Sequence, residues 1–71
     1  MYRKMITTAL EVIPNTHDID PRHVEAWLRQ EHATLDHLSS KEFFMQAITA
    51  IQLIREGGKE VAEQLAQSLG L

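Results

Sequence analysis

Histidine and carboxylate side chains are the groups in this sequence whose types and spacing are suited to chemistry. The chain has four histidines, which are His17, His23, His32 and His37. His32 and Asp36 are four residues apart, a spacing that puts two side chains on one face of a helix. A zinc ion needs three or four such ligands and outer-shell support for them. We interpret the histidines as surface residues and predict no metal ligands, with a histidine/carboxylate metal-binding protein kept as an alternative.

Nucleophilic catalysis has no evident residues in this chain. There is no cysteine, so thiol chemistry, thiolate metal sites and disulfides are excluded. The sequence has no Gly-x-Ser-x-Gly elbow and no glycine-rich loop suited to holding a phosphate. Thr34, Ser39 and Ser40, the hydroxyls near the histidines, are accounted for by helix capping and turns. We therefore predict that the protein is not an enzyme and has no catalytic residues and no cofactor.

Length and charge limit the class of protein. The 71 residues make one domain, residues 1–71, with seven basic and ten acidic side chains and a net charge of −3. Nucleic-acid binding needs a basic patch, which the sequence lacks, so a nucleic-acid partner is not favoured. No apolar run is long enough to span a bilayer, and the first residues do not have the pattern of a signal peptide. We expect a cytoplasmic protein with no membrane association.

Helices are the elements that must position any site in this chain. The sequence pattern of the first half predicts two helices. Residues 2–13 carry apolar side chains at steps of three and four, the stripe of a helix that ends before Pro14. In the stretch DIDPRHVEAWLRQEH, residues 18–32, Asp20 is placed to cap a helix whose first residue is Pro21.

The end of this second helix is also predicted from spacing. Glu25 and Arg29 form a pair four residues apart in the favourable order. The apolar stripe is interrupted at Glu31 and His32, so we expect the helix to end or bend there. The following ATLDHL, residues 33–38, is expected to form a last turn or a short separate helix.

The second half of the chain predicts a helical hairpin. Ser39, with Glu42 three residues later, forms a capping box that begins a helix. The residues behind it are the most apolar of the chain, and Gly57-Gly58 ends the helix. A last helix is expected over residues 59–69, and a link this short favours antiparallel packing of the two helices.

The third helix offers more apolar surface than one short neighbouring helix can cover. Either the first two helices cover the excess, or it forms the seam of a symmetric dimer, and we favour the dimer. A tryptophan earlier in the chain can serve as a core anchor or as an interface hot spot. The candidate interface residues are Trp27, Phe43, Phe44, Ile48 and Ile51. The pattern does not separate core from interface among them.

Three phrases resemble known groups of proteins. EVIPNTHDIDPRHVEAWLRQEHATLDHLS, followed by an apolar helix and AEQLAQSLGL, resembles short uncharacterised helical proteins of bacterial mobile elements and prophages. That resemblance covers most of the chain and brings no activity or catalytic residues with it. VEAWLR is similar to a phrase in the toxin-binding domains of bacterial antitoxins, and VAEQLAQSLG is similar to a phrase of helix-turn-helix regulators. The last two imply a small DNA-associated regulator or antitoxin-like protein as an alternative.

These observations predict an all-α fold, a small bundle of three to four helices with a C-terminal antiparallel helical hairpin. We interpret the protein as a non-enzymatic protein–protein interaction module that self-associates as a homodimer. The regulator and the metal-binding protein are the two alternatives.

Overall fold

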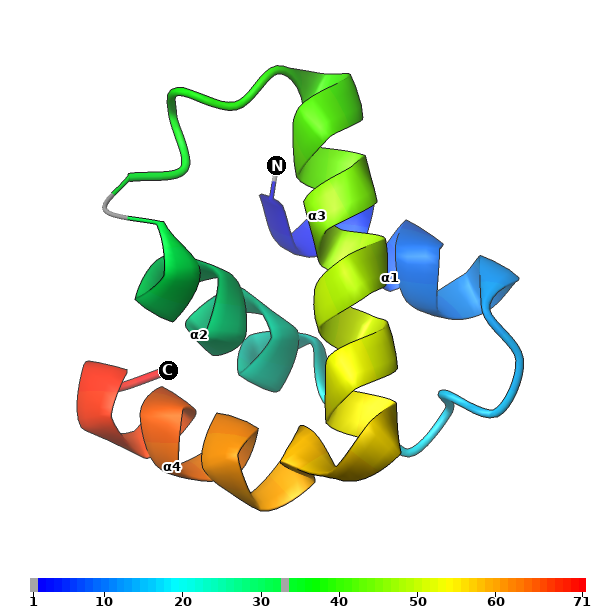
Figure 1. Cartoon of the computed structure of the whole chain (residues 1–71), viewed down its shortest axis with the longest axis vertical. Coiled ribbons are helices and arrows are strands. Elements are labelled where there is room, and N and C mark those ends of the chain that lie inside the picture. Colours follow the sequence, from blue (N-terminus) through cyan, green and yellow to red (C-terminus); the bar gives the residue numbers. More distant parts are fainter. Residues whose placement is uncertain (1, 33) are drawn as a thin grey trace.

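The computed structural model describes residues 2–32 and 34–71, and it is all-helical. The helices are α1 (Tyr2–Val12), α2 (Pro21–Glu31) and a long run made of α3 (Ser40–Leu53), η1 (Ile54–Gly58) and α4 (Lys59–Leu69) (Figure 1). Within the described residues there is no β-strand. The all-α prediction is therefore confirmed.

Helix α1 forms where the apolar stripe predicts it, and a side chain from the following loop closes its end. The Thr16 hydroxyl donates to the carbonyl oxygens of Leu10 at 2.7 Å and Ile13 at 2.8 Å. These carbonyls lack a partner within the helix. At the other end of α1, the ring of Tyr2 stacks on Phe43 with centroids 5.0 Å apart. The N-terminal half of α1 is therefore fixed against α3.

Helix α2 begins and ends as predicted. The Asp20 carboxylate accepts a hydrogen bond from the backbone N–H of Arg22 at 2.9 Å, and Pro21 follows the cap. The helix ends at Glu31, and His32 has extended backbone dihedrals. The short helix or last turn expected over residues 33–38 falls partly on Ala33, which lies outside the described residues. Residues 34–38 form a bend and a turn, without a helix of their own.

The predicted capping box begins α3. The Ser39 hydroxyl accepts from the Glu42 N–H at 3.1 Å, and the Glu42 carboxylate accepts from the Ser39 N–H at 2.9 Å. The long run changes direction at Gly57, whose φ of 133° lies outside the range that other residues favour. Gly58 returns to a negative φ, and α4 follows directly.

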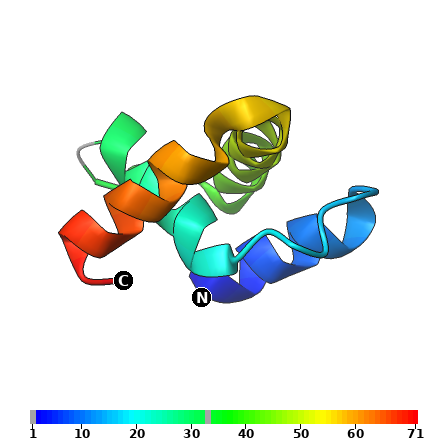
Figure 2. The same ribbon diagram turned by 90° about the horizontal axis from the view of Figure 1, so that it is seen from below.

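The expected antiparallel hairpin of the last two helices is not confirmed. Helix α4 packs against α2, which is the most extensive contact between elements, and α3 is not among the elements that α4 contacts extensively. Figure 2 shows α4 leading away from the end of α3 and crossing α2. One residue with non-helical dihedrals bends the chain without reversing it, so α4 reaches α2 and does not return along α3.

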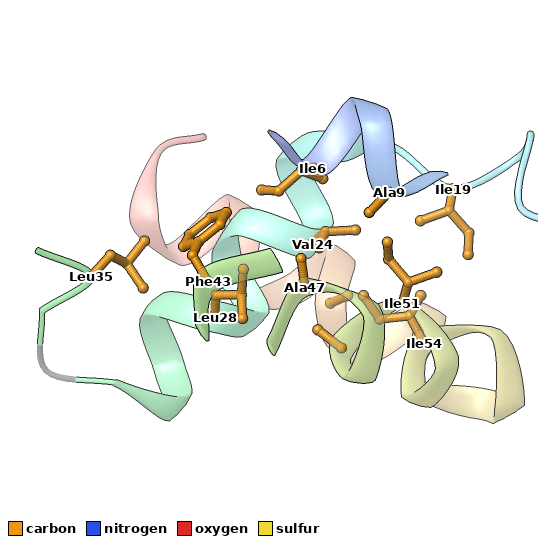
Figure 3. Close-up of a cluster of buried hydrophobic side chains, with 12 residues drawn as sticks. Ile6, Ala9, Ile19, Val24, Leu28, Leu35, Phe43, Ala47, Ile51 and Ile54 are labelled. Atoms are coloured by element: carbon orange, nitrogen blue, oxygen red, sulfur yellow. The ribbon is translucent and has the colours of Figure 1, made fainter. Parts of the chain in front are cut away.

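Helix α2 is the centre of the fold, because α1, α3 and α4 all contact it. A single cluster of buried side chains joins α1, α2 and α3, with Leu35 from the turn and Ala62 from α4 (Figure 3). Ala26, Ala62 and Ala66 are also buried. Small side chains at these positions let α2 and α4 approach closely.

Candidate functional site

The four histidines do not form a site. His17 and His37 are exposed in the loop before α2 and the turn after it, and His23 is half-buried on α2. Because α2 ends at Glu31, His32 and Asp36 do not share a helix face. The Nε2 atom of His32 is enclosed and has no hydrogen-bond partner among the described residues. No three histidine or carboxylate side chains in residues 2–32 and 34–71 could hold a metal ion together.

The strongest ionic cluster joins two helices. Glu25 of α2 is buried and accepts hydrogen bonds from Arg3 of α1 at 2.7 Å and from Arg29 of α2 at 2.9 Å. Burial by itself raises the pKa of Glu25, but the hydrogen bonds from both arginines outweigh it and lower the pKa. The predicted Glu25–Arg29 pair is confirmed. Arg3 completes the cluster and fastens α1 to α2, so we assign it a structural role.

One hollow of the surface lies between the end of α1 and the loop that leads to α2. Its volume is about 480 Å³, and it is wide open to solvent. The lining residues are Thr7, Leu10, Glu11, Ile13, Asn15, Thr16, His17, Ile19 and Pro21. Among them, Thr16 donates its hydroxyl hydrogen bond to the end of α1. Glu11 and His17 are exposed. No buried polar group points to a ligand in this hollow.

The five candidate interface residues separate into two groups. Phe43 and Ile51 are fully buried in the chain's own core (Figure 3). Trp27, Phe44 and Ile48 are partly buried and pack against the edge of that core. The interface prediction for the second group rests on side chains that still reach solvent.

The outer face of α3 carries apolar residues that the list of five missed. Met45 is 57% exposed and Leu53 is 45% exposed. They lie eight residues apart on a helix whose buried residues are Phe43, Ala47, Ala50 and Ile51. A helical projection about these four would have placed Met45 outward, but the very apolar composition of the segment hid this distinction.

Over residues 43–54, this outer face carries no charge. Residues 43–54, FFMQAITAIQLI, contain no charged side chain, and their exposed members are Met45, Gln46, Thr49, Gln52 and Leu53. The exposed sides of the other helices carry arginine, lysine or glutamate. The centres of protein interfaces are depleted in charged residues and enriched in methionine and aromatic residues. The face therefore has the composition of an interface.

A small hollow opens beside this face, between α2 and α3. Its volume is about 90 Å³, and its lining residues are Trp27, Leu28, Glu31, Gln46, Thr49, Ala50 and Leu53. We call it the Trp27 hollow. The indole also packs close to Gly58, where an added Cβ atom would lie 2.8 Å from the ring. Trp27 is thus held in place by the chain while part of it remains accessible.

Most of the basic side chains form ion pairs or hydrogen bonds with other residues of the chain. Four of the seven pair with carboxylates, namely Arg3, Arg22, Arg29 and Lys59. Arg55 donates to the carbonyl oxygen of Pro14 at 2.8 Å. Among the described residues there is also no helix of the length and apolarity that a bilayer span requires.

Comparison with protein-family models, with curated proteins and with solved structures found no match for this chain. The resemblance to proteins of mobile elements stays a prediction.

Proposed function

We propose that this protein is a protein–protein interaction module that acts by binding rather than by catalysis, and that it self-associates. The observation that carries the proposal is the outer face of α3, which is uncharged over residues 43–54 and exposes Met45 and Leu53. Burying such a face removes apolar surface from water without desolvating a charge. Trp27 at the rim of the face supplies the aromatic residue that interface hot spots favour.

The use of basic side chains supports a protein partner over a nucleic acid. Phosphate contacts need free lysine and arginine side chains. Here most of them pair with acidic groups of the same chain, and the net charge is −3.

The first test is the molar mass in solution, measured by light scattering after size exclusion over a range of protein concentrations. We expect a mass of twice the 8.1 kDa chain at high concentration. Met45→Glu should raise the dissociation constant of the dimer by about tenfold or more, because it places a charge in the apolar seam. Methionine and glutamate have similar helix propensities, so α3 should remain folded.

Val61→Glu is the matched control. Val61 is 51% exposed, similar to Met45, but lies on α4. This substitution should leave the dissociation constant unchanged. A wild-type protein that stays monomeric at all concentrations, or a loss of association from Val61→Glu as large as that from Met45→Glu, would contradict the proposal.

A further inference from the structure

Five exposed residues form one stripe along the outer face of α3 and η1. They are Lys41, Met45, Thr49, Gln52 and Glu56, at steps of three and four residues. We call this the outer stripe. Side chains at this spacing lie in one line on a helix. The stripe has a basic residue at one end, an acidic residue at the other and an uncharged centre.

The outer stripe is complementary to itself when reversed. Thr49 lies at its middle, with Lys41 and Glu56 at nearly equal separations on either side. In an antiparallel pair of such helices, each lysine meets the glutamate of the other copy. In a parallel pair, each lysine would meet a lysine. The ion pairs within the described residues, Arg3–Glu25, Arg22–Asp20, Arg29–Glu25 and Lys59–Asp18, use neither Lys41 nor Glu56.

We propose that the partner of α3 is the α3 of a second copy of this chain, packed antiparallel about a two-fold axis at Thr49. Two-fold symmetry makes every contact occur twice: if a residue of the first copy touches a certain residue of the second, the same two positions also touch with the copies exchanged. The inference rests on the proposed self-association and adds to it the partner, the direction and the register.

The Trp27 hollow fits this register. An axis at Thr49 places Met45 of one copy opposite Leu53 of the other, because both are four residues from the axis. Leu53 and Ala50 line the hollow together with Trp27. Its volume of about 90 Å³ suits a single apolar side chain. A methionine is flexible enough to fill an irregular space of this kind and makes favourable contacts with aromatic rings. Each Met45 therefore inserts beside the partner copy's tryptophan, twice per dimer.

Engineered cysteines test the register, because the chain has no cysteine of its own. Thr49→Cys should form a disulfide-linked dimer on mild oxidation, because a residue on the axis meets its own copy. Met45→Cys should not, because the two substituted positions lie roughly 12 Å apart along the helices. A disulfide needs Cα atoms about 4.4–6.8 Å apart. Light scattering of both variants under reducing, non-denaturing conditions measures the non-covalent dimer separately.

Exchanged charges test the direction. Lys41→Glu gives a stripe with two acidic ends, and Glu56→Lys gives a stripe with two basic ends. In an antiparallel pair, each variant alone should dimerise with a dissociation constant about tenfold higher than that of the wild type. In a parallel pair, like charges meet at both ends in the wild type and in each variant, so the dissociation constants would be equal. An equimolar mixture of the two variants should form a heterodimer with the dissociation constant of the wild type, because opposite charges then meet at both ends. The double variant Lys41→Glu/Glu56→Lys should also regain the wild-type dissociation constant.

The outcomes separate the two proposals. Cross-linking at residue 49 but not at residue 45, with weaker dimerisation of each single charge variant and recovery in their mixture, supports the antiparallel register. A dimer that cross-links at residue 45, or whose single charge variants dimerise as tightly as the wild type, overturns the register while the proposed function stands. A monomeric wild-type protein overturns both.

Discussion

Gly58 contributes to stability because the ring of Trp27 packs directly against it. Its φ of −89° is open to any residue, but a Cβ atom there would lie 2.8 Å from the Cη2 and Cζ3 atoms of Trp27. We expect Gly58→Ala to lower the free energy of unfolding by about 1–3 kcal/mol, because the ring must shift. Urea denaturation followed by circular dichroism measures this change.

A double-mutant cycle assigns the Gly58 effect to the ring. In a Trp27→Leu background, Gly58→Ala should cost clearly less than in the wild type. Gly57→Ala should cost the same in both backgrounds, because no atom lies within 4 Å of a Cβ at Gly57 and its cost comes from the φ of 133°. Equal costs of Gly58→Ala in the two backgrounds would refute the explanation.

Asp20 and Glu25 are two of the carboxylates with a lowered pKa, and they make stability depend on pH. Hydrogen bonds from the Arg22 side chain hold the pKa of Asp20 at about 2, below its usual 3.8. Burial works against the charged form of Glu25, but its hydrogen bonds from Arg3 and Arg29 prevail and bring its pKa below the usual 4.5. A lowered pKa means that the folded state favours the charged form. The stabilisation is therefore complete above the unfolded pKa and is lost as the pH falls through the folded value.

We expect the free energy of unfolding to fall steadily from about pH 4.5 towards pH 2. Glu25→Gln should flatten this dependence and cost about 1–3 kcal/mol at pH 7, since it weakens two charge-assisted hydrogen bonds in a buried place. Chemical denaturation at a series of pH values provides the measurement. Glu63→Gln, at an exposed position of α4, is the control. A Glu25→Gln protein with the wild-type pH dependence would show that this carboxylate is not responsible.

Residue contacts could be predicted from the sequence where they are local. The caps at Asp20 and Ser39 and the Glu25–Arg29 pair depend on residues at most four positions apart. The Arg3–Glu25 bond could not be predicted, because its partners come from different helices. The sequence provided no sign of which helices would meet.

At the scale of elements, the contact between α2 and α4 depends on alanines. Ala62 is fully buried, and α2 is the helix that α4 contacts most. Ala62→Leu should lower the free energy of unfolding by about 1–3 kcal/mol, because the larger side chain forces the two helices apart. Gln64→Leu puts the same side chain on the exposed side of α4 and should change stability by less than about 0.5 kcal/mol. Thermal denaturation of both variants checks this, and equal losses would contradict the close packing.

The ends of the helices were predictable, but the direction of α4 was not. Capping residues, Pro21 and the glycine pair fix where helices start and stop through short-range hydrogen bonds and backbone sterics. The hairpin prediction used only the length of the link. A link of two residues permits many angles, and the choice among them depends on the dihedrals of Gly57 and on the contact of α4 with α2.

For the whole molecule, the sequence could indicate a surplus of apolar surface without locating it. Phe43 and Phe44 are neighbours of the same type, yet Phe43 is buried and Phe44 is only partly covered. The difference depends on where α1 and α2 lie around α3, which is a property of the assembled fold. The same is true of the Trp27 hollow, whose lining residues come from two helices.

The bend at Gly57 has a consequence for how copies of this chain could exchange parts. If residue 57 adopted ordinary helical dihedrals, residues 40–69 would form one rod about 45 Å long, well beyond the 28 Å of the folded molecule. Helix α4 would then leave its own α2 uncovered, and the α4 of a second such chain could cover it, which would be a domain-swapped dimer. The backbone conformation of a single glycine thus directs α4 onto the α2 of its own chain.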